Sequence, residues 1–232
     1  MELERRPLPE FTSALTKKER IFVGVGFILH IFLLPRLIVR LIAAGRLGET
    51  AGNFLLYAVM AVYTVGFLWG FLRRDFDPLA DRPFNTVYEI LWGYFSIMCL
   101  NMLTSLVLSY FEQGANPNNE AVLDMAAESG GPVTAMAVFL APIVEEVLFR
   151  AGIFSSLRKF SRVWAYAVSA AVFSLYHLSG FILLDVRNLV YLVQYIPAGI
   201  ILCRAYERSS TIWCPIGLHM LVNFVSIQAA AV

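Results

Sequence analysis

The sequence has little charge for its length. Only 15% of its 232 residues are Asp, Glu, Lys or Arg, whereas ordinary soluble domains contain about 25%. Hydrophobic residues make up 59%, which excludes a disordered chain and an ordinary water-facing surface. The formal net charge is +1, so no global field would attract nucleic acid. We therefore predict an integral membrane protein that has no nucleic-acid partner.

Cysteine and zinc-binding motifs are also scarce. The three cysteines (Cys99, Cys203 and Cys214) contain no CxxC pair and fit no disulfide framework. We interpret them as small apolar residues of membrane spans. The chain also lacks the HExxH motif, in which one helix supplies two imidazoles to zinc.

Long stretches carry no charged residue at all, namely residues 50–72, 90–111, 163–184 and 209–232. A helix of 22 residues is about 33 Å long and can cross a hydrocarbon core of about 30 Å. Three weaker apolar runs bring the predicted spans to seven, near residues 21–44, 51–72, 87–111, 132–155, 162–180, 188–204 and 212–231. The predicted fold is an all-α, polytopic transmembrane bundle. An eighth helix stays open, because Pro35, Arg36 and Arg40 interrupt the first run.

We expect one membrane domain. Residues 1–20 are predicted to form a cytoplasmic N-terminal segment and residues 21–232 a single membrane-embedded domain, with its motif-bearing core at 132–228. Residues 120–128, in the longest loop, are compatible with a short helix at the membrane interface or with a solvated linker.

The basic residues are unevenly divided between the two ends of the predicted spans. One side carries thirteen: Arg5, Arg6, Lys17, Lys18, Arg20, Arg73, Arg74, Arg82, Arg158, Lys159, Arg162, Arg204 and Arg208. The other side carries four: Arg36, Arg40, Arg46 and Arg187. Cytoplasmic loops are enriched in Lys and Arg, so we predict a cytoplasmic N-terminus.

Three of the predicted spans contain polar residues that are costly inside a membrane, which makes them candidates for a functional site. Along a helix, Glu145 lies about 20 Å from Arg158, His177 about 22 Å from Arg162, and His219 about 16 Å from Arg208. These flanking charges stand outside the hydrocarbon. The three side chains are therefore expected at a similar depth, near the middle of the membrane.

Spacing within the helices predicts roles. Glu146 and Arg150 are four residues apart and can pair on one face. Glu145 is rotated by about 100° from Glu146, faces elsewhere and is the candidate general base. Asn223 shares a face with His219, so it can orient the imidazole or donate to a developing oxyanion.

Other residues of the spans suggest structural roles. Pro142 removes one backbone hydrogen bond and can kink the helix near the two glutamates. His30 has no polar neighbour in sequence and is interpreted as a packed, interhelical hydrogen-bonding residue. Taken alone, Phe173 suggests simple packing.

The motifs resemble those of the CAAX-protease and bacteriocin-processing family, also called the Abi family. That family carries EExxxR, FxxxH and HxxxN in this order on successive membrane helices. This chain carries all three: Glu145-Glu146-xxx-Arg150, Phe173-xxx-His177 and His219-xxx-Asn223. The resemblance covers about residues 140–224. It implies an intramembrane endopeptidase related to the type II CAAX prenyl endopeptidases, which remove three residues from a prenylated C-terminus.

The resemblance also implies a mechanism. Glu145 activates a water, His177 positions it, and His219 and Asn223 stabilise the oxyanion. Glu146 completes the catalytic set, while Arg150 and Phe173 support it. No cofactor is favoured, but zinc or another divalent metal is an alternative. Its ligands would then be Glu145, Glu146, His177 and His219.

The expected partners are the lipid bilayer and a membrane-associated peptide or protein substrate, lipidated or not. Bacterial relatives are associated with bacteriocin maturation, self-immunity and peptide-signal processing, so a bacterial cell membrane is the expected location. The oligomeric state stays open. Three alternatives also stay open: a scaffold, regulator or immunity protein of the same family, a small proton-coupled transporter, and a haem or quinone protein that uses His177 and His219.

Overall fold

The computed structural model describes residues 11–111 and 113–230. All regular elements in these two ranges are helices. Seven of the resulting helical rods are long and apolar enough to cross a membrane, which confirms the predicted all-α transmembrane bundle. The beginning of the predicted N-terminal segment, with Arg5 and Arg6, lies outside the described residues.

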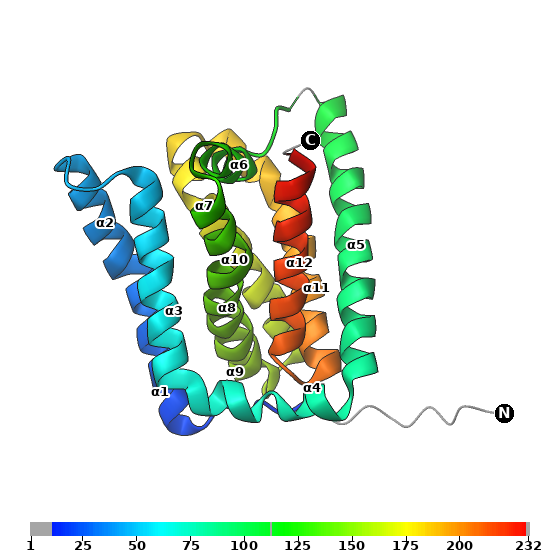
Figure 1. The fold of residues 1–232 in the computed structure, drawn as a ribbon. Coiled ribbons are helices and arrows are strands. Elements are labelled where there is room, and N and C mark those ends of the chain that lie inside the picture. Colours follow the sequence, from blue (N-terminus) through cyan, green and yellow to red (C-terminus); the bar gives the residue numbers. More distant parts are fainter. Residues whose placement is uncertain (1–10, 112, 231–232) are drawn as a thin grey trace.

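The first three rods are built from the N-terminal half of the chain. The first contains α1 (Lys17–Ile28), the π-helix η1 (Leu29–Leu33) and α2 (Leu34–Ala43), so Pro35 does not divide it into two spans. The second contains α3 (Glu49–Arg74) and the short α4 (Asp77–Asp81), and the third is α5 (Pro83–Tyr110). In Figure 1, α3 and α5 stand on opposite sides of the bundle.

The last four rods contain the motifs. The fourth runs through α7 (Gly131–Ala135), η2 (Met136–Leu140), α8 (Ala141–Glu146), η3 (Val147–Phe154) and α9 (Ser155–Arg158). The fifth is α10 (Arg162–Leu184). The sixth combines the 3₁₀-helix η4 (Val186–Tyr191) with α11 (Leu192–Ser209), and the seventh is α12 (Trp213–Ala230).

The fourth rod is the most enclosed of the seven. About 67% of its most apolar window is buried, against at most 39% in the others. It packs against α1, α3, α10 and α12. Pro142 lies in the first turn of α8, directly after the π-helix η2. A π-helical segment thus lies directly before Pro142, and the two glutamates that follow are buried.

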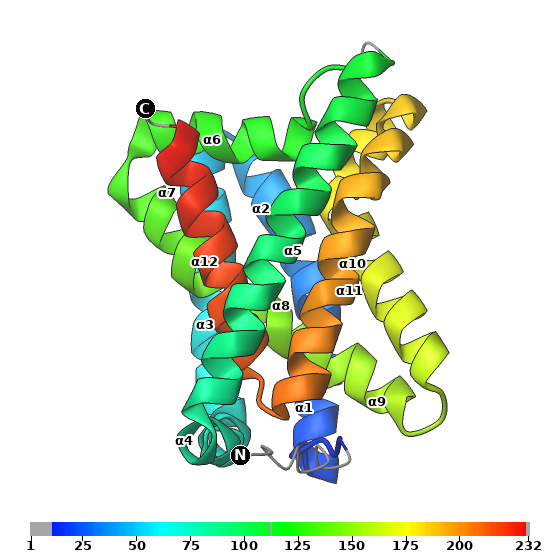
Figure 2. The ribbon, with the colours of Figure 1, turned by 90° about the vertical axis from the view of Figure 1, so that its right-hand side faces the viewer.

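Helix α6 (Pro117–Ser129) lies across one end of the bundle (Figures 1 and 2). It contacts α7, α10 and α12. The side chain of Asn116 caps it by accepting hydrogen bonds from the backbone amides of Asn118 and Asn119, and Pro117 occupies the first turn. Of the two alternatives predicted for residues 120–128, the structure contains the helix.

Small residues allow the motif-bearing helices to approach closely. A Cβ atom placed on Gly199 of α11 would lie 2.9 Å from the Cα of Ala170 in α10. A Cβ atom on Gly152 of η3 would lie 2.7 Å from a methyl group of Val23 in α1. Such positions accept only glycine without a shift of the neighbouring atoms, and small residues of this kind are typical of membrane helix packing.

Candidate active site

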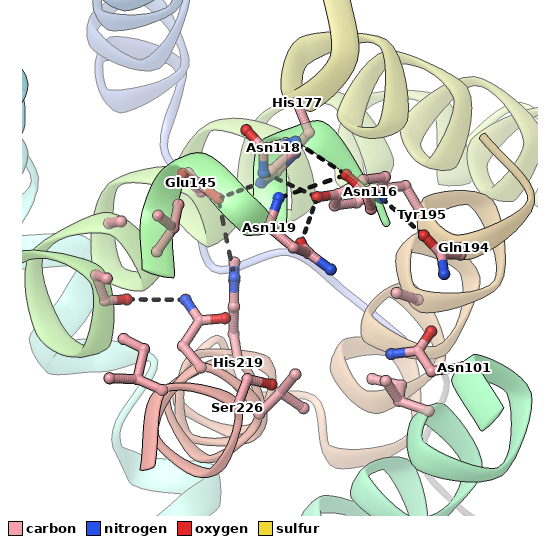
Figure 3. A pocket seen from close by; sticks show the side chains of 18 of the residues that line it. Asn101, Asn116, Asn118, Asn119, Glu145, His177, Gln194, Tyr195, His219 and Ser226 are labelled. Carbon is pink, nitrogen blue, oxygen red and sulfur yellow. Dashed lines mark hydrogen bonds and ion pairs between the residues drawn. The ribbon is translucent and has the colours of Figure 1, made fainter. Parts of the chain in front are cut away.

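The side chains predicted from three motifs meet at one cavity. The cavity has a volume of about 320 Å³, and Glu145, Phe173, His177, His219 and Asn223 all line it. Figure 3 shows Glu145 of α8, His177 of α10 and His219 of α12 pointing toward one another. Residues that are 32 to 74 positions apart in sequence thus form one polar cluster inside the bundle.

The two carboxylate oxygens of Glu145 have different surroundings. Oε1 accepts a hydrogen bond of 2.6 Å from the hydroxyl of Tyr57. Oε2 lies 3.5 Å from Nε2 of His177 and 3.9 Å from Nε2 of His219. It is buried and has no hydrogen-bond partner among the described residues. Oε2 is therefore the oxygen that is free for chemistry.

Both histidine rings are fixed through Nδ1. His177 Nδ1 donates to the backbone carbonyl of Phe173 at 2.9 Å, because a carbonyl oxygen can only accept. His219 Nδ1 donates to Oε1 of Glu146 at 2.8 Å. In a neutral ring this leaves Nε2 unprotonated. Two ring nitrogens and Glu145 Oε2 therefore face one another as three acceptors, a set to which a water molecule can donate hydrogens.

Glu146 and Arg150 lie behind this cluster. Their side chains are fully buried, and Arg150 Nε is 3.1 Å from Glu146 Oε2. Arg150 also stands 4.1 Å from the ring centroid of Phe173, in a cation–π arrangement. Phe173 in turn packs against the rings of His177 and His219. Phe173 thus links the ion pair to both imidazoles instead of only filling space.

Asn223 has a different hydrogen-bond partner from the one that one of its two predicted roles requires. Its Nδ2 donates to the backbone carbonyl of Ala137 at 2.8 Å, in the π-helix η2. The His219 ring is held instead by Glu146, so the prediction that Asn223 orients this imidazole is wrong. The amide of Asn223 still lines the cavity and keeps one hydrogen that the Ala137 bond does not use.

Three further residues near Glu145 were not predicted as part of the site. Tyr57 binds Glu145, the hydroxyls of Tyr57 and Tyr176 are 2.8 Å apart, and Tyr176 is 2.8 Å from Nε2 of His30. His30 is fully buried and does make an interhelical hydrogen bond, as predicted, but its partner connects it to the site. A tyrosine hydroxyl in mid-span needs a partner, which is the signal that could have revealed these residues.

Polar side chains of α6 and α11 form the rim of the cavity nearest α6. Tyr195 stacks on the His177 ring, with centroids 4.9 Å apart. Its hydroxyl accepts from Asn118 at 2.8 Å and donates to Asn119 at 2.9 Å. Asn116 donates to Gln194 at 2.7 Å. Figure 3 shows these groups gathered on one side of the cavity, so α6 is connected to His177 through Tyr195.

Of the four residues predicted as alternative metal ligands, Glu145, His177 and His219 face one another, whereas Glu146 points toward Arg150. No group of three or more His, Cys, Asp or Glu side chains is arranged to hold a metal ion in the part of the chain that the structure describes. Glu146 is engaged by Arg150 and by Nδ1 of His219. We therefore derive no catalytic step through a metal.

Comparison with known proteins identifies the region that forms this site. Residues 129–225 match the family described as type II CAAX prenyl endopeptidase Rce1-like. The part of the chain that forms most of this site is thus similar to the Rce1-like family. The resemblance predicted from the three motifs is thereby confirmed.

Two bacterial relatives match parts of the chain. The "Membrane-embedded CAAX protease MroQ" of Staphylococcus aureus is 30% identical over 149 residues, which cover 59% of this chain and 56% of the relative. The "Putative membrane peptidase YdiL" of Bacillus subtilis is 29% identical over 113 residues, which cover 48% of this chain and 42% of the relative. The matches thus span about half the length of these relatives. No solved structure matches the chain.

Proposed function

We propose that the chain is a membrane-embedded endopeptidase in which Glu145 activates the attacking water. The observation that carries the proposal is the position of Glu145 Oε2, buried, without a hydrogen-bond partner among the described residues, and facing Nε2 of both His177 and His219. A general base needs such a free, correctly placed acceptor within reach of the nucleophile. The Rce1-like match over residues 129–225 supports this reading.

The proposed reaction is a general-base hydrolysis. In the reactive state His219 carries a hydrogen on both ring nitrogens. A water held by Glu145 Oε2 and His177 Nε2 gives one proton to Glu145 Oε2 and donates its second hydrogen to His177 Nε2. The water oxygen attacks the scissile carbonyl carbon, and the carbonyl oxygen becomes an oxyanion. When the C–N bond breaks, the leaving amine takes the proton from Glu145. Water attack and amine departure thus use the same carboxyl group.

We assign oxyanion stabilisation to Asn223 and His219. The free hydrogen of the Asn223 amide is one donor. His219 is the other when its Nε2 carries a proton, because the Glu146 carboxylate on Nδ1 then stabilises the charged ring. Arg150 and Phe173 act only by holding Glu146 and the two rings. An oxyanion donor of this kind contributes about 10²–10³-fold in rate.

The proposed substrate is a membrane-associated peptide or protein. The cavity combines apolar walls, such as Ile97, Leu202 and Ile227, with the amides of Asn118 and Asn119. Apolar walls accept a lipid or an apolar side chain, while amides can pair with a peptide backbone. Because relatives with protease names come from bacteria, we propose a bacterial cell membrane as the location. The N-terminus is proposed to be cytoplasmic.

The test compares membrane-bound and secreted peptides from cells that express the wild type or Glu145→Gln. Peptides that disappear in the variant, together with accumulating precursors, would support the proposal and identify the substrate. Glu128→Gln is the control, because it makes the same chemical change at an exposed position on α6. Unchanged cleavage by a folded, membrane-inserted Glu145→Gln protein would overturn the proposal.

The same substrate tests the metal-free form of the mechanism. We expect activity to persist after strong chelation, with no stoichiometric metal in the purified protein. Stoichiometric zinc that is lost together with activity would replace the general-base mechanism with a metalloprotease mechanism.

A further inference from the structure

A chain of hydrogen bonds leads away from the free side of the active site. It runs from Glu145 Oε1 to the Tyr57 hydroxyl at 2.6 Å, to the Tyr176 hydroxyl at 2.8 Å and to His30 Nε2 at 2.8 Å. These hydrogen bonds connect residues on α8, α3, α10 and η1. It ends at His30, whose Nδ1 is buried and has no partner among the described residues.

We propose that Tyr57, Tyr176 and His30 are positioning residues that hold Glu145 in its working orientation. This inference rests on the proposed function of Glu145. By occupying Oε1, Tyr57 keeps the carboxylate from rotating and leaves Oε2 facing the two histidines. Tyr176 and His30 act through Tyr57, by orienting its hydroxyl. Tyr57 and His30 lie outside residues 129–225, so the N-terminal rods contribute to the site.

Hydrogen counting gives the chain one direction. A tyrosine hydroxyl has one hydrogen to donate. Tyr57 donates its hydrogen to Glu145, so the Tyr176 hydroxyl must donate to Tyr57. Tyr176 then has none left, and His30 must donate from Nε2. The arrangement therefore requires a hydrogen on Nε2 of His30. In a neutral ring Nδ1 then carries none, in agreement with the unpartnered Nδ1 atom.

If the hydrogen bonds ran in the reverse direction, Glu145 would have to be a donor. If His30 carried its hydrogen on Nδ1, its Nε2 would accept from Tyr176, and Tyr176 would accept from Tyr57. The hydrogen of Tyr57 would then be used, so Glu145 would have to donate to Tyr57. The ring nitrogen of His30 that carries the hydrogen therefore shows whether Glu145 Oε1 accepts a hydrogen bond from Tyr57 or donates one.

The first experiment separates positioning from structural support. Its substrate is an internally quenched peptide built around the cleavage site found in the Glu145→Gln comparison. We expect Tyr57→Phe to lower kcat by about 10- to 100-fold, the loss of one hydrogen bond to a charged group, with KM within about twofold. Tyr176→Phe should lower kcat less, and the double variant should equal Tyr57→Phe, since Tyr176 acts through Tyr57.

Tyr63→Phe is the matched control. Tyr63 is also on α3 and donates to a backbone carbonyl, that of Phe22, at 2.8 Å, outside the chain. Its loss should leave kcat within about twofold. A Tyr57→Phe variant with wild-type kcat would overturn the inference. So would independent, multiplicative effects of Tyr57→Phe and Tyr176→Phe.

The second experiment does not depend on activity. The sequence contains three histidines, so ¹⁵N-histidine labelling gives few imidazole signals, and His30→Phe assigns those of His30. We expect a protonated Nε2 and an unprotonated Nδ1 for His30, with the Nε2 signal shifted by Tyr176→Phe. An Nε2 atom without a hydrogen would overturn the proposed direction of the hydrogen bonds. If no cleavage is found, only the proposed function is contradicted. The histidine spectrum still tests the hydrogen bonds between His30, Tyr176 and Tyr57.

Discussion

Removing Arg150 should destabilise the protein more than any other single loss of charge among the residues described for the site. Its guanidinium is 3.1 Å from Glu146 Oε2, and both side chains are fully buried. Arg150→Met keeps the volume and the apolar stem but leaves the Glu146 carboxylate with only His219 beside it. Loss of one partner of a buried pair costs about 3–5 kcal/mol, because the other charge stays desolvated.

A thermal melt in detergent measures this cost. At about 2–4 °C per kcal/mol for a chain of this size, Arg150→Met should lower the Tm by about 6–20 °C. The double variant Glu146→Gln/Arg150→Met removes both charges while keeping a side-chain oxygen that can accept from His219. It should recover most of the lost Tm. The recovery isolates the pair interaction in the manner of a double-mutant cycle.

Two outcomes would refute this reasoning. A wild-type Tm for Arg150→Met would mean that Glu146 does not need its partner. A double variant that is as unstable as the sum of the single variants would mean that the two charges act independently. Arg74→Met is a suitable control, because its pair with Glu19 is partly exposed and should cost only about 0–1 kcal/mol.

Two further predictions concern helix packing and orientation. Gly199→Ala places a Cβ atom 2.9 Å from the Cα of Ala170 and should lower stability by about 1–3 kcal/mol in the same thermal melt. Gly66→Ala is the control, because its Cβ atom meets no atom within 4 Å, and it should leave the Tm unchanged. Equal Tm values for the two variants would contradict the close approach of α10 and α11. Orientation can be tested with a membrane-impermeant thiol reagent on intact cells that carry Cys99→Ala. The reagent should label Ala115→Cys, on the outer side, but not Phe160→Cys, on the cytoplasmic side. The opposite pattern would contradict the proposed cytoplasmic N-terminus.

The rods could be predicted from the sequence because a membrane leaves few alternatives. Charge-free stretches such as residues 50–72 and 163–184 are long enough to cross the hydrocarbon core, and the backbone there has to be helical. Helix α6 was harder to predict, because a polar segment of this length has similar composition as a helix and as a linker. Its capping by Asn116 and its contacts with α10 and α12 stabilise the helix.

The candidate site was predictable at the level of residues and not at the level of contacts. Costly groups such as Glu145 and His177 are visible within apolar stretches, and helical spacing predicts the pairing of Glu146 with Arg150. The neighbours of Glu145 could not be assigned, because the hydroxyls of Tyr57 and Tyr176 in a span signal only that each needs some partner. Their partners lie 88 and 146 positions away in sequence. Asn223 was misjudged in one role because helical spacing cannot reveal that η2 offers it a backbone carbonyl.

The π-helical segments on either side of α8 have a consequence for the length of the chain. A π turn contains about one residue more than an α turn, and neighbouring residues of a helix differ in direction by about 100°. Deleting one residue from η2 would therefore convert its wide turn into a normal one and leave Glu145 and Glu146 facing in nearly the same direction relative to α7. A deletion in a regular α-helical part of this rod would instead rotate them by about 100°. The π-helical turn of η2 thus absorbs one residue, so an alignment gap at this place would alter the direction of the two carboxylates less than a gap in the α-helical parts of the same rod.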